Sequence, residues 1–130
     1  MRVLLDTHIW IWNLAGSERM PERFRAILSE EATEAWLSPI SVWEATILAA
    51  RGRISLLPDP ETWVEEALAR WPVKEARLSF AVAMRSHKLG LPHQDPADRF
   101  IAATALVYGL HLMTLDQRLL DAQWLPTVAP

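Results

Sequence analysis

The stretch Val3–Thr7, with the sequence VLLDT, decides the fold class. Its three apolar residues do not alternate with polar ones, which is typical of a strand buried on both faces of a sheet. Asp6 ends the run, and a short apolar helix is expected to begin at Ile9. Strands buried on both faces belong to parallel sheets that helices cover on each side. The stretch therefore predicts an α/β protein with a carboxylate at the carboxyl end of its first strand.

The rest of the chain continues this alternation of strands and helices. A capping residue followed by proline predicts helices over residues 39–50 and 96–108. Further strands are expected at 35–37, 72–76, 110–115 and 127–128, and further helices at 21–31, 60–71, 78–89 and 117–123. No repeat or linker interrupts the pattern. We therefore expect residues 1–130 to form a single three-layer α/β/α domain with a central parallel sheet.

Composition excludes several classes of protein. The formal net charge is −3 and no block of Lys and Arg is present, so the chain is not a module that coats nucleic acid by charge alone. The absence of cysteine excludes disulfides, thiolate zinc sites and cysteine nucleophiles. No stretch approaches the ~20 apolar residues of a membrane span, and the N-terminal apolar run is too short for a signal peptide. We expect a cytoplasmic protein without membrane contact.

Two carboxylates follow predicted strands directly. Asp6 comes after the first strand, and Asp116 comes after the strand at 110–115. Ligands of such sheets bind beyond the carboxyl ends of the strands, where both side chains would emerge. Each residue also precedes a predicted helix, and aspartate is a common N-cap. Taken singly, each is better explained as a cap.

Glu44 lies on a helix face that is expected to pack against the core. It is one turn from Ile40 and from Leu48, on an apolar face that also includes Trp43. A capping box that begins at Ser41 is an alternative explanation, although the proline signal places the helix start earlier. A buried carboxylate needs a partner, which either an arginine or a metal ion would supply.

Asp98 presents the same problem on the later helix. Its side chain projects from the face that carries Ile101 and Ala105. Asp95 is the expected cap of this helix, and the helix dipole favours a negative charge at the position of Asp98. An inward direction is nevertheless difficult to explain by capping alone.

The four carboxylates Asp6, Glu44, Asp98 and Asp116 are expected to converge at the carboxyl edge of the sheet. Clustered like charges raise one another's pKa unless a positive charge lies between them. Oxygen ligands without cysteine suit Mg²⁺ or Mn²⁺ rather than zinc. Such ions activate water and neutralise charge on phosphate during phosphodiester hydrolysis. Such a cluster would suit one of these ions, whereas the capping and ion-pair explanations remain open for its single members.

The motifs around these carboxylates resemble the PIN domain, and more narrowly the VapC-type toxins of toxin–antitoxin pairs. They are LLDTH around Asp6, SVWE ending at Glu44, HQDPADR around Asp98 and TLD ending at Asp116, and the likeness covers residues 2–120. The resemblance implies Mg²⁺- or Mn²⁺-dependent endonucleolytic cleavage of RNA, usually by a homodimer. It also implies a cognate antitoxin protein that inserts a segment, often with a basic residue, into the acidic site.

The resemblance implies that Asp6, Glu44, Asp98 and Asp116 are the metal ligands and catalytic residues. It gives supporting roles to further residues. Thr7 and Thr114 occupy places where a hydroxyl often supports the acidic site, and Asp95 matches an acidic position common in this subgroup. Arg99 either pairs with one of the four carboxylates or faces solvent.

A metal-dependent DNase is the nearest alternative function, and the lack of a basic surface favours RNA. A phosphatase of the Asp-nucleophile type would carry a second Asp two residues after Asp6, where this chain has His8, so that alternative is disfavoured.

The histidines and tryptophans remain open at this point. His8 and His93 lie close to members of the acidic cluster, but the four histidines share no metal-ligand spacing, and structural or solvent-facing roles are favoured for all four. The seven tryptophans are expected mostly in the core. Trp10, Trp12 and Trp43 would alternatively line a dimer interface, where aromatic residues are enriched.

Overall fold

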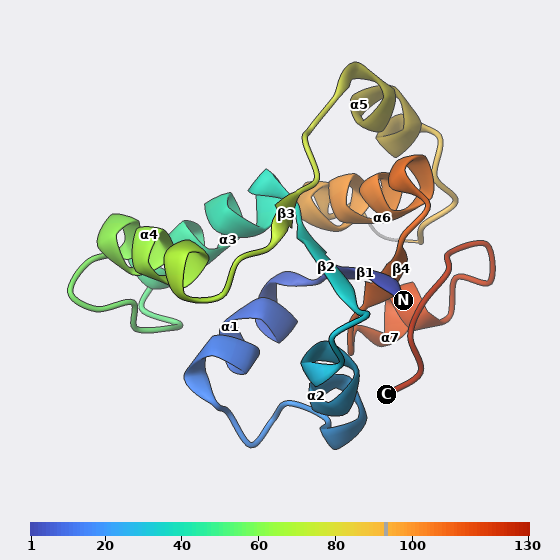
Figure 1. The fold of residues 1–130 in the computed structure, drawn as a ribbon. Coiled ribbons are helices and arrows are strands. Elements are labelled where there is room, and N and C mark those ends of the chain that lie inside the picture. The colour runs from blue at the N-terminus through green and yellow to red at the C-terminus, as the bar shows by residue number, and fades with distance from the viewer. Residues whose placement is uncertain (93) are drawn as a thin grey trace.

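The computed structural model describes residues 1–92 and 94–130 (Figure 1). Its strands are β1 (Arg2–Leu5), β2 (Glu34–Leu37), β3 (Lys74–Glu75) and β4 (His111–Met113). Its helices are α1 (Thr7–Ala15), α2 (Glu22–Ser29), α3 (Pro39–Ala50), α4 (Pro60–Arg70), α5 (Phe80–His87), α6 (Pro96–Tyr108) and α7 (Gln117–Leu120). Among the described residues, no helix is long and apolar enough to cross a membrane.

The four strands form one parallel sheet in the order β3-β2-β1-β4. The first strand is central, as its unbroken apolar run predicts: Val3, Leu4 and Leu5 are each 0% exposed. Val3 and Leu5 pack in one hydrophobic cluster with Trp10 of α1, whereas Leu4 packs in a second cluster with α6. Helices therefore cover both faces of the sheet, and the predicted α/β/α arrangement is confirmed.

The two helix-start signals lie where the sequence predicts them. The Ser38 hydroxyl accepts a hydrogen bond from the Ile40 N–H at 3.1 Å, and Asp95 accepts one from the Ala97 N–H at 3.0 Å. Gly109 ends α6 with a positive φ of 66°, a conformation that suits a residue without a Cβ. These caps fix the directions of α3 and α6, which carry two of the predicted site residues.

The C-terminal part of the chain differs from the prediction. The strand expected at 110–115 is shorter, because the chain turns at Thr114 toward α7. Residues 127–128 do not form a full strand but make one bridge, from Thr127 to Leu112 of β4. Hydrogen bonds from the Leu112 N–H to Pro126 and from the Val128 N–H to Leu112, both 2.9 Å, hold this segment along the outer side of β4.

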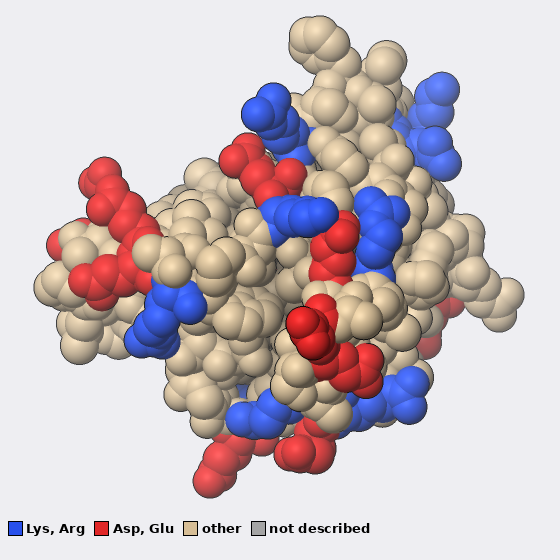
Figure 2. Space-filling view, viewed as in Figure 1, with Lys and Arg blue, Asp and Glu red and all other residues tan. Residues whose placement is uncertain are grey.

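Charged side chains of both signs are interspersed over the face of the molecule drawn in Figure 2. No broad basic surface is visible on that face, which agrees with the formal net charge of −3. Binding of a polyanion to this face would therefore depend on a few well-placed cations and on ions from solution rather than on a general basic surface.

Candidate active site

Asp6 and Asp116 lie side by side at the carboxyl edge of the sheet, because β1 and β4 are adjacent parallel strands. Each also caps the helix that follows it. Asp6 accepts a hydrogen bond from the Thr7 N–H at 2.8 Å, and Asp116 accepts one from the Arg118 N–H at 2.9 Å. The capping role and the placement at the sheet edge are therefore both correct for these two residues.

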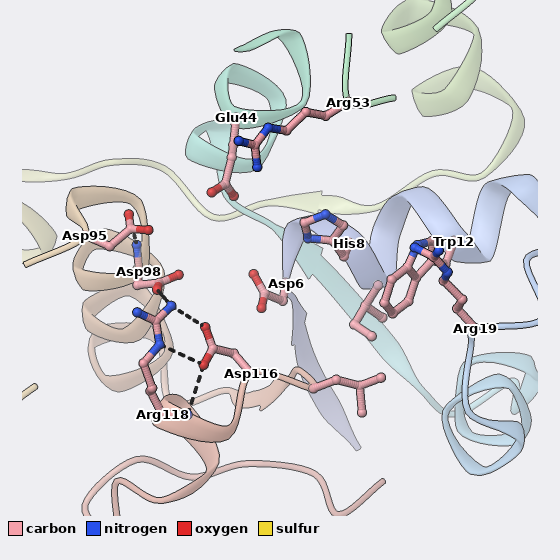
Figure 3. A pocket seen from close by; sticks show the side chains of 12 residues that line it. Asp6, His8, Trp12, Arg19, Glu44, Arg53, Asp95, Asp98, Asp116 and Arg118 are labelled. Atoms are coloured by element: carbon pink, nitrogen blue, oxygen red, sulfur yellow. Dashed lines mark hydrogen bonds and ion pairs between the residues drawn. The ribbon is translucent and has the colours of Figure 1, made fainter. Parts of the chain in front are cut away.

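Glu44 from α3 and Asp98 from α6 face the same place as the two strand-end carboxylates (Figure 3). Together with Asp95, they line one open cleft of about 580 Å³. Asp98 is only 7% exposed, and Glu44 is partly buried. Four segments that are far apart in the sequence thus deliver carboxylates to one cleft, as predicted.

The face of α3 that packs on the core differs from the predicted face. Trp43, expected on the core face of α3, is 54% exposed. The buried residues of this helix are Ser41 and Ala45 instead. Small side chains let α3 approach α1 so closely that the Ser41 and Thr7 hydroxyls are 3.0 Å apart. Glu44 lies beside this contact and projects into the cleft rather than into the core.

Two buried threonines orient the carboxylates. The Thr114 hydroxyl donates to Asp6 Oδ2 at 2.6 Å and accepts a hydrogen bond from the Asp116 N–H at 3.0 Å. The Thr7 hydroxyl donates to the Glu44 carboxylate. Both threonines are at most 1% exposed, so these hydrogen bonds are shielded from water. The supporting role expected of the two hydroxyls is confirmed.

Arg118 is a cation of the cleft that sequence reasoning missed. Its Nη2 atom lies 3.0 Å from Asp116 Oδ2 and 3.5 Å from Asp98 Oδ2, and its Nε donates to Asp116 Oδ1 at 3.2 Å. The guanidinium thus neutralises part of the charge on one side of the cleft (Figure 3). The neighbouring position of Arg118 and Asp116 in the sequence was the only available signal, because the contact to Asp98 depends on the fold.

Burial destabilises the ionised forms of Asp6 and Glu44, the carboxylates on the other side of the cleft. Removal from bulk water raises the pKa of Asp6, although hydrogen bonds from Thr114 and Thr7 act in the opposite direction. Removal from water also raises the pKa of Glu44; the Thr7 hydroxyl lowers it, and the nearby Asp6 charge raises it further. In the described part of the chain, neither carboxylate forms an ion pair. A bound cation would stabilise both ionised carboxylates.

The donor set fits a hard divalent cation, because every acidic side chain that lines the cleft offers carboxylate oxygens. Among residues 1–92 and 94–130, however, no three His, Cys, Asp or Glu side chains are close enough to hold one ion. The carboxylates therefore share a cleft without forming a closed coordination shell.

A family model for the PIN domain matches residues 3–125. The chain belongs to the PIN domain family. Ribonuclease VapC22 of Mycobacterium tuberculosis is 34% identical to it over 120 residues, which are 90% of this chain and 88% of that protein.

Solved structures agree on the PIN fold. VapBC2 of Rickettsia felis, bound to a DNA fragment from its promoter, aligns with a TM-score of 0.73 and 15% identity, over 98% of both chains. VapC20 of Mycobacterium tuberculosis, a toxin that cleaves the sarcin–ricin loop, aligns with a TM-score of 0.63 and 17% identity. The alignment with VapC20 covers 98% of this chain and 99% of the VapC20 chain.

The structure also shows where two residues that the sequence left open, Asp95 and Arg99, lie. Asp95 caps the first turn of α6 and lines the mouth of the cleft. Arg99 does not reach the cleft; it donates to the backbone carbonyls of Ser86 and Leu89 at 3.2 and 3.4 Å. His93 lies outside the described residues.

The aromatic residues of α1 divide between two environments in this PIN domain. Trp10 is 0% exposed and belongs to the core, whereas His8 and Trp12 line the cleft. Arg19 and Arg53 also reach the cleft, and sequence reasoning identified neither of them. No local pattern marks these arginines, because each lies in a connection whose path depends on the packed helices.

Proposed function

We propose that this protein is a divalent-metal-dependent endoribonuclease and the toxin of a toxin–antitoxin pair. Membership of the PIN family and 34% identity to Ribonuclease VapC22 support RNA cleavage. The observation that carries the proposal is the convergence of four carboxylates, from two strand ends and two helices, on one cleft.

Asp6, Glu44, Asp98 and Asp116 would hold the ion, and Mg²⁺ or Mn²⁺ suits their oxygen ligands. Such an ion supplies an activated water and neutralises charge on the phosphate. The raised pKa of Asp6 and of Glu44 supports this assignment, because both ionised carboxylates are stabilised by a nearby cation. The side chains would have to turn toward one another to share an ion.

The chain's own residues prepare the site for this chemistry. The Thr114 hydroxyl donates to Asp6 Oδ2, and the Thr7 hydroxyl donates to Glu44, so each of these two carboxylates has a buried hydrogen-bond donor beside it. Arg118 neutralises part of the Asp98 and Asp116 charge, so a polyanion meets less repulsion at this edge. These contacts order the acidic site before a substrate phosphate enters.

A protein antitoxin and a homodimer are the partners that we propose. A solved toxin–antitoxin complex from Klebsiella pneumoniae supports the first, because it aligns with this chain with a TM-score of 0.63 over 88% of the chain. Exposed apolar side chains on α5 support the second: Phe80 is 89% exposed and Met84 is 65% exposed. Light scattering during gel filtration would measure the mass of the protein alone and with its antitoxin.

The function is tested by incubating purified protein with a panel of labelled RNAs in Mg²⁺ or Mn²⁺. We expect cleavage that stops with EDTA and with Asp6→Asn. Asp121→Asn is the matched control, because Asp121 is exposed and lies outside the cleft. Cleavage that persists with Asp6→Asn, or intact RNA together with no metal binding by calorimetry, would contradict the proposal. A single-stranded DNA panel in the same assay distinguishes a DNase.

A further inference from the structure

Two aromatic rings form one wall of the acidic cleft. His8 and Trp12 lie one turn apart on α1, with ring centroids 5.5 Å apart and ring planes inclined by 50°. Both rings line the same cleft as Asp6, on the side opposite Arg118 (Figure 3). His8 is exposed and Trp12 is partly buried, so the pair offers ring surface to a ligand in the cleft. We call these two residues the α1 ledge.

Two arginines lie beside the α1 ledge. Arg19 is next to Trp12, and Arg53 extends toward the upper part of the cleft near Glu44 (Figure 3). Both arginines are exposed. Among the described residues, neither guanidinium forms an ion pair or a side-chain hydrogen bond, in contrast to Arg118. Their charge is thus available to an anionic ligand that reaches past the carboxylates.

We propose that the α1 ledge stacks an unpaired base next to the cleaved phosphate, while Arg19 and Arg53 bind the adjoining backbone phosphates. This inference rests on the proposed ribonuclease function and assigns residues of this chain to the base and to the backbone of the substrate. The cleft volume of about 580 Å³ falls within the range of small-ligand sites, roughly 300–1,000 Å³.

Stacking explains why the ledge selects unpaired RNA. In an A-form helix the base faces are covered by neighbouring bases, whereas loops and single strands can turn a base out onto an aromatic ring. Stacking tolerates any base, because every base has a π face. Arginine in turn matches phosphate geometry with its planar fork of donors. The aromatic wall and the flanking cations therefore recognise the two chemical parts of one nucleotide.

Binding can be separated from cleavage by measuring fluorescence anisotropy of a labelled single-stranded oligoribonucleotide in EDTA. We expect His8→Ala to weaken binding by on the order of tenfold, and His8→Phe, which keeps a ring, to restore it. Trp12→Leu should also weaken binding, whereas Trp43→Leu, on an exposed side chain outside the cleft, should not. A duplex of the same sequence should bind more weakly than the single strand.

The arginines are tested by the salt dependence of the same binding. Arg19→Gln should weaken binding and reduce the slope of log K against log salt by about one, the change expected for one lost phosphate contact. Arg23→Gln is the control, since Arg23 is exposed on α2 and does not line the cleft. An unchanged slope for Arg19→Gln would remove the phosphate-binding part of the proposal.

The outcomes distinguish this inference from the proposed function. If the wild-type protein cleaves RNA but His8→Ala and Trp12→Leu bind it normally, the α1 ledge is not a base site and the ribonuclease function stands. If these variants weaken binding of the antitoxin but not of RNA, the ledge is a protein contact and the inference is wrong. If the wild-type protein neither binds nor cleaves RNA, the proposed function itself fails.

Discussion

Glu34 at the amino end of the central sheet and two carboxylates at its carboxyl end, Asp6 and Glu44, differ in their partners. At the amino end, Glu34 lies 2.9 Å from Lys74 Nζ and 3.4 Å from Arg2 Nε, and the Trp36 indole donates to it at 2.7 Å. At the carboxyl end, Asp6 and the nearby Glu44 accept hydrogen bonds from hydroxyls and a backbone N–H, and among the described residues neither has a cationic partner.

The pKa values record this difference. Hydrogen bonds from Lys74 and Trp36 lower the pKa of Glu34, whereas removal from water raises the pKa of Asp6 and of Glu44. The same chain therefore neutralises a carboxylate where it serves the fold and leaves two without a neutralising partner where the cleft lies. Such an imbalance is typical of a functional site, since a buried carboxylate without a cationic partner destabilises the folded state.

Replacing Asp98 is expected to have the largest effect on RNA cleavage. We expect Asp98→Asn to reduce metal-dependent RNA cleavage by roughly 10²–10³-fold, the scale of losing one group that stabilises transition-state charge. The variant should still unfold cooperatively in urea with EDTA present, because Arg118 retains its contacts with Asp116. Cleavage rates and urea unfolding of the same preparation measure both. Full activity of Asp98→Asn would refute the assignment.

Removing a supporting hydroxyl should have the next largest effect. Thr114→Val deletes the donor to Asp6 and the acceptor of the Asp116 N–H, and we expect metal affinity to fall by about 10- to 100-fold. Titration calorimetry with Mn²⁺ measures this change. Thr104→Val is the matched control, because Thr104 is equally buried and donates only to the Phe100 carbonyl within α6. Equal affinities of the two variants would show that Thr114 only packs.

The raised pKa values predict a pH dependence of stability in EDTA. Between the ordinary pKa of about 4 and the raised native value, the unfolded chain releases protons that folded Asp6 and Glu44 retain, so stability falls as pH rises. Each tenfold difference in proton affinity corresponds to about 1.4 kcal/mol. We expect a flatter curve for the double variant Asp6→Asn, Glu44→Gln in urea unfolding at several pH values. Parallel curves for the two proteins would contradict this cause.

The smallest effect is expected at the amino end of the sheet. Glu34→Gln should lower the melting temperature slightly at low salt, and the difference should disappear near 1 M salt because these side chains are exposed to screening. The contribution of Glu34 is present above its ordinary pKa and is lost as pH falls through the lowered native value. Cleavage should be unchanged, and Glu30→Gln serves as control. Loss of cleavage with Glu34→Gln would remove the contrast between the two ends.

The sequence predicted where the carboxylates lie better than it predicted the packing around them. Strand ends and caps are local signals, so the positions of Asp6 and Asp116 could be inferred from apolar runs and turn chemistry. Periodicity failed on α3, where it assigned Trp43 to the core, because it cannot detect that small residues bring two helices together at Ser41. It also could not predict that Arg118 reaches Asp98, a contact created by the path of the chain from α6 through β4.

The bridge between Leu112 and Thr127 has a consequence for self-association. An uncovered edge strand presents unpaired amide and carbonyl groups that can recruit further chains. The backbone of Pro126–Val128 already occupies the outer side of β4, and the strand at the opposite edge, β3, has only two residues. Within the described residues, the sheet therefore offers no long template for aggregation. A dimer of this protein would form through the outer surfaces of helices rather than by extending the sheet from one subunit to the next.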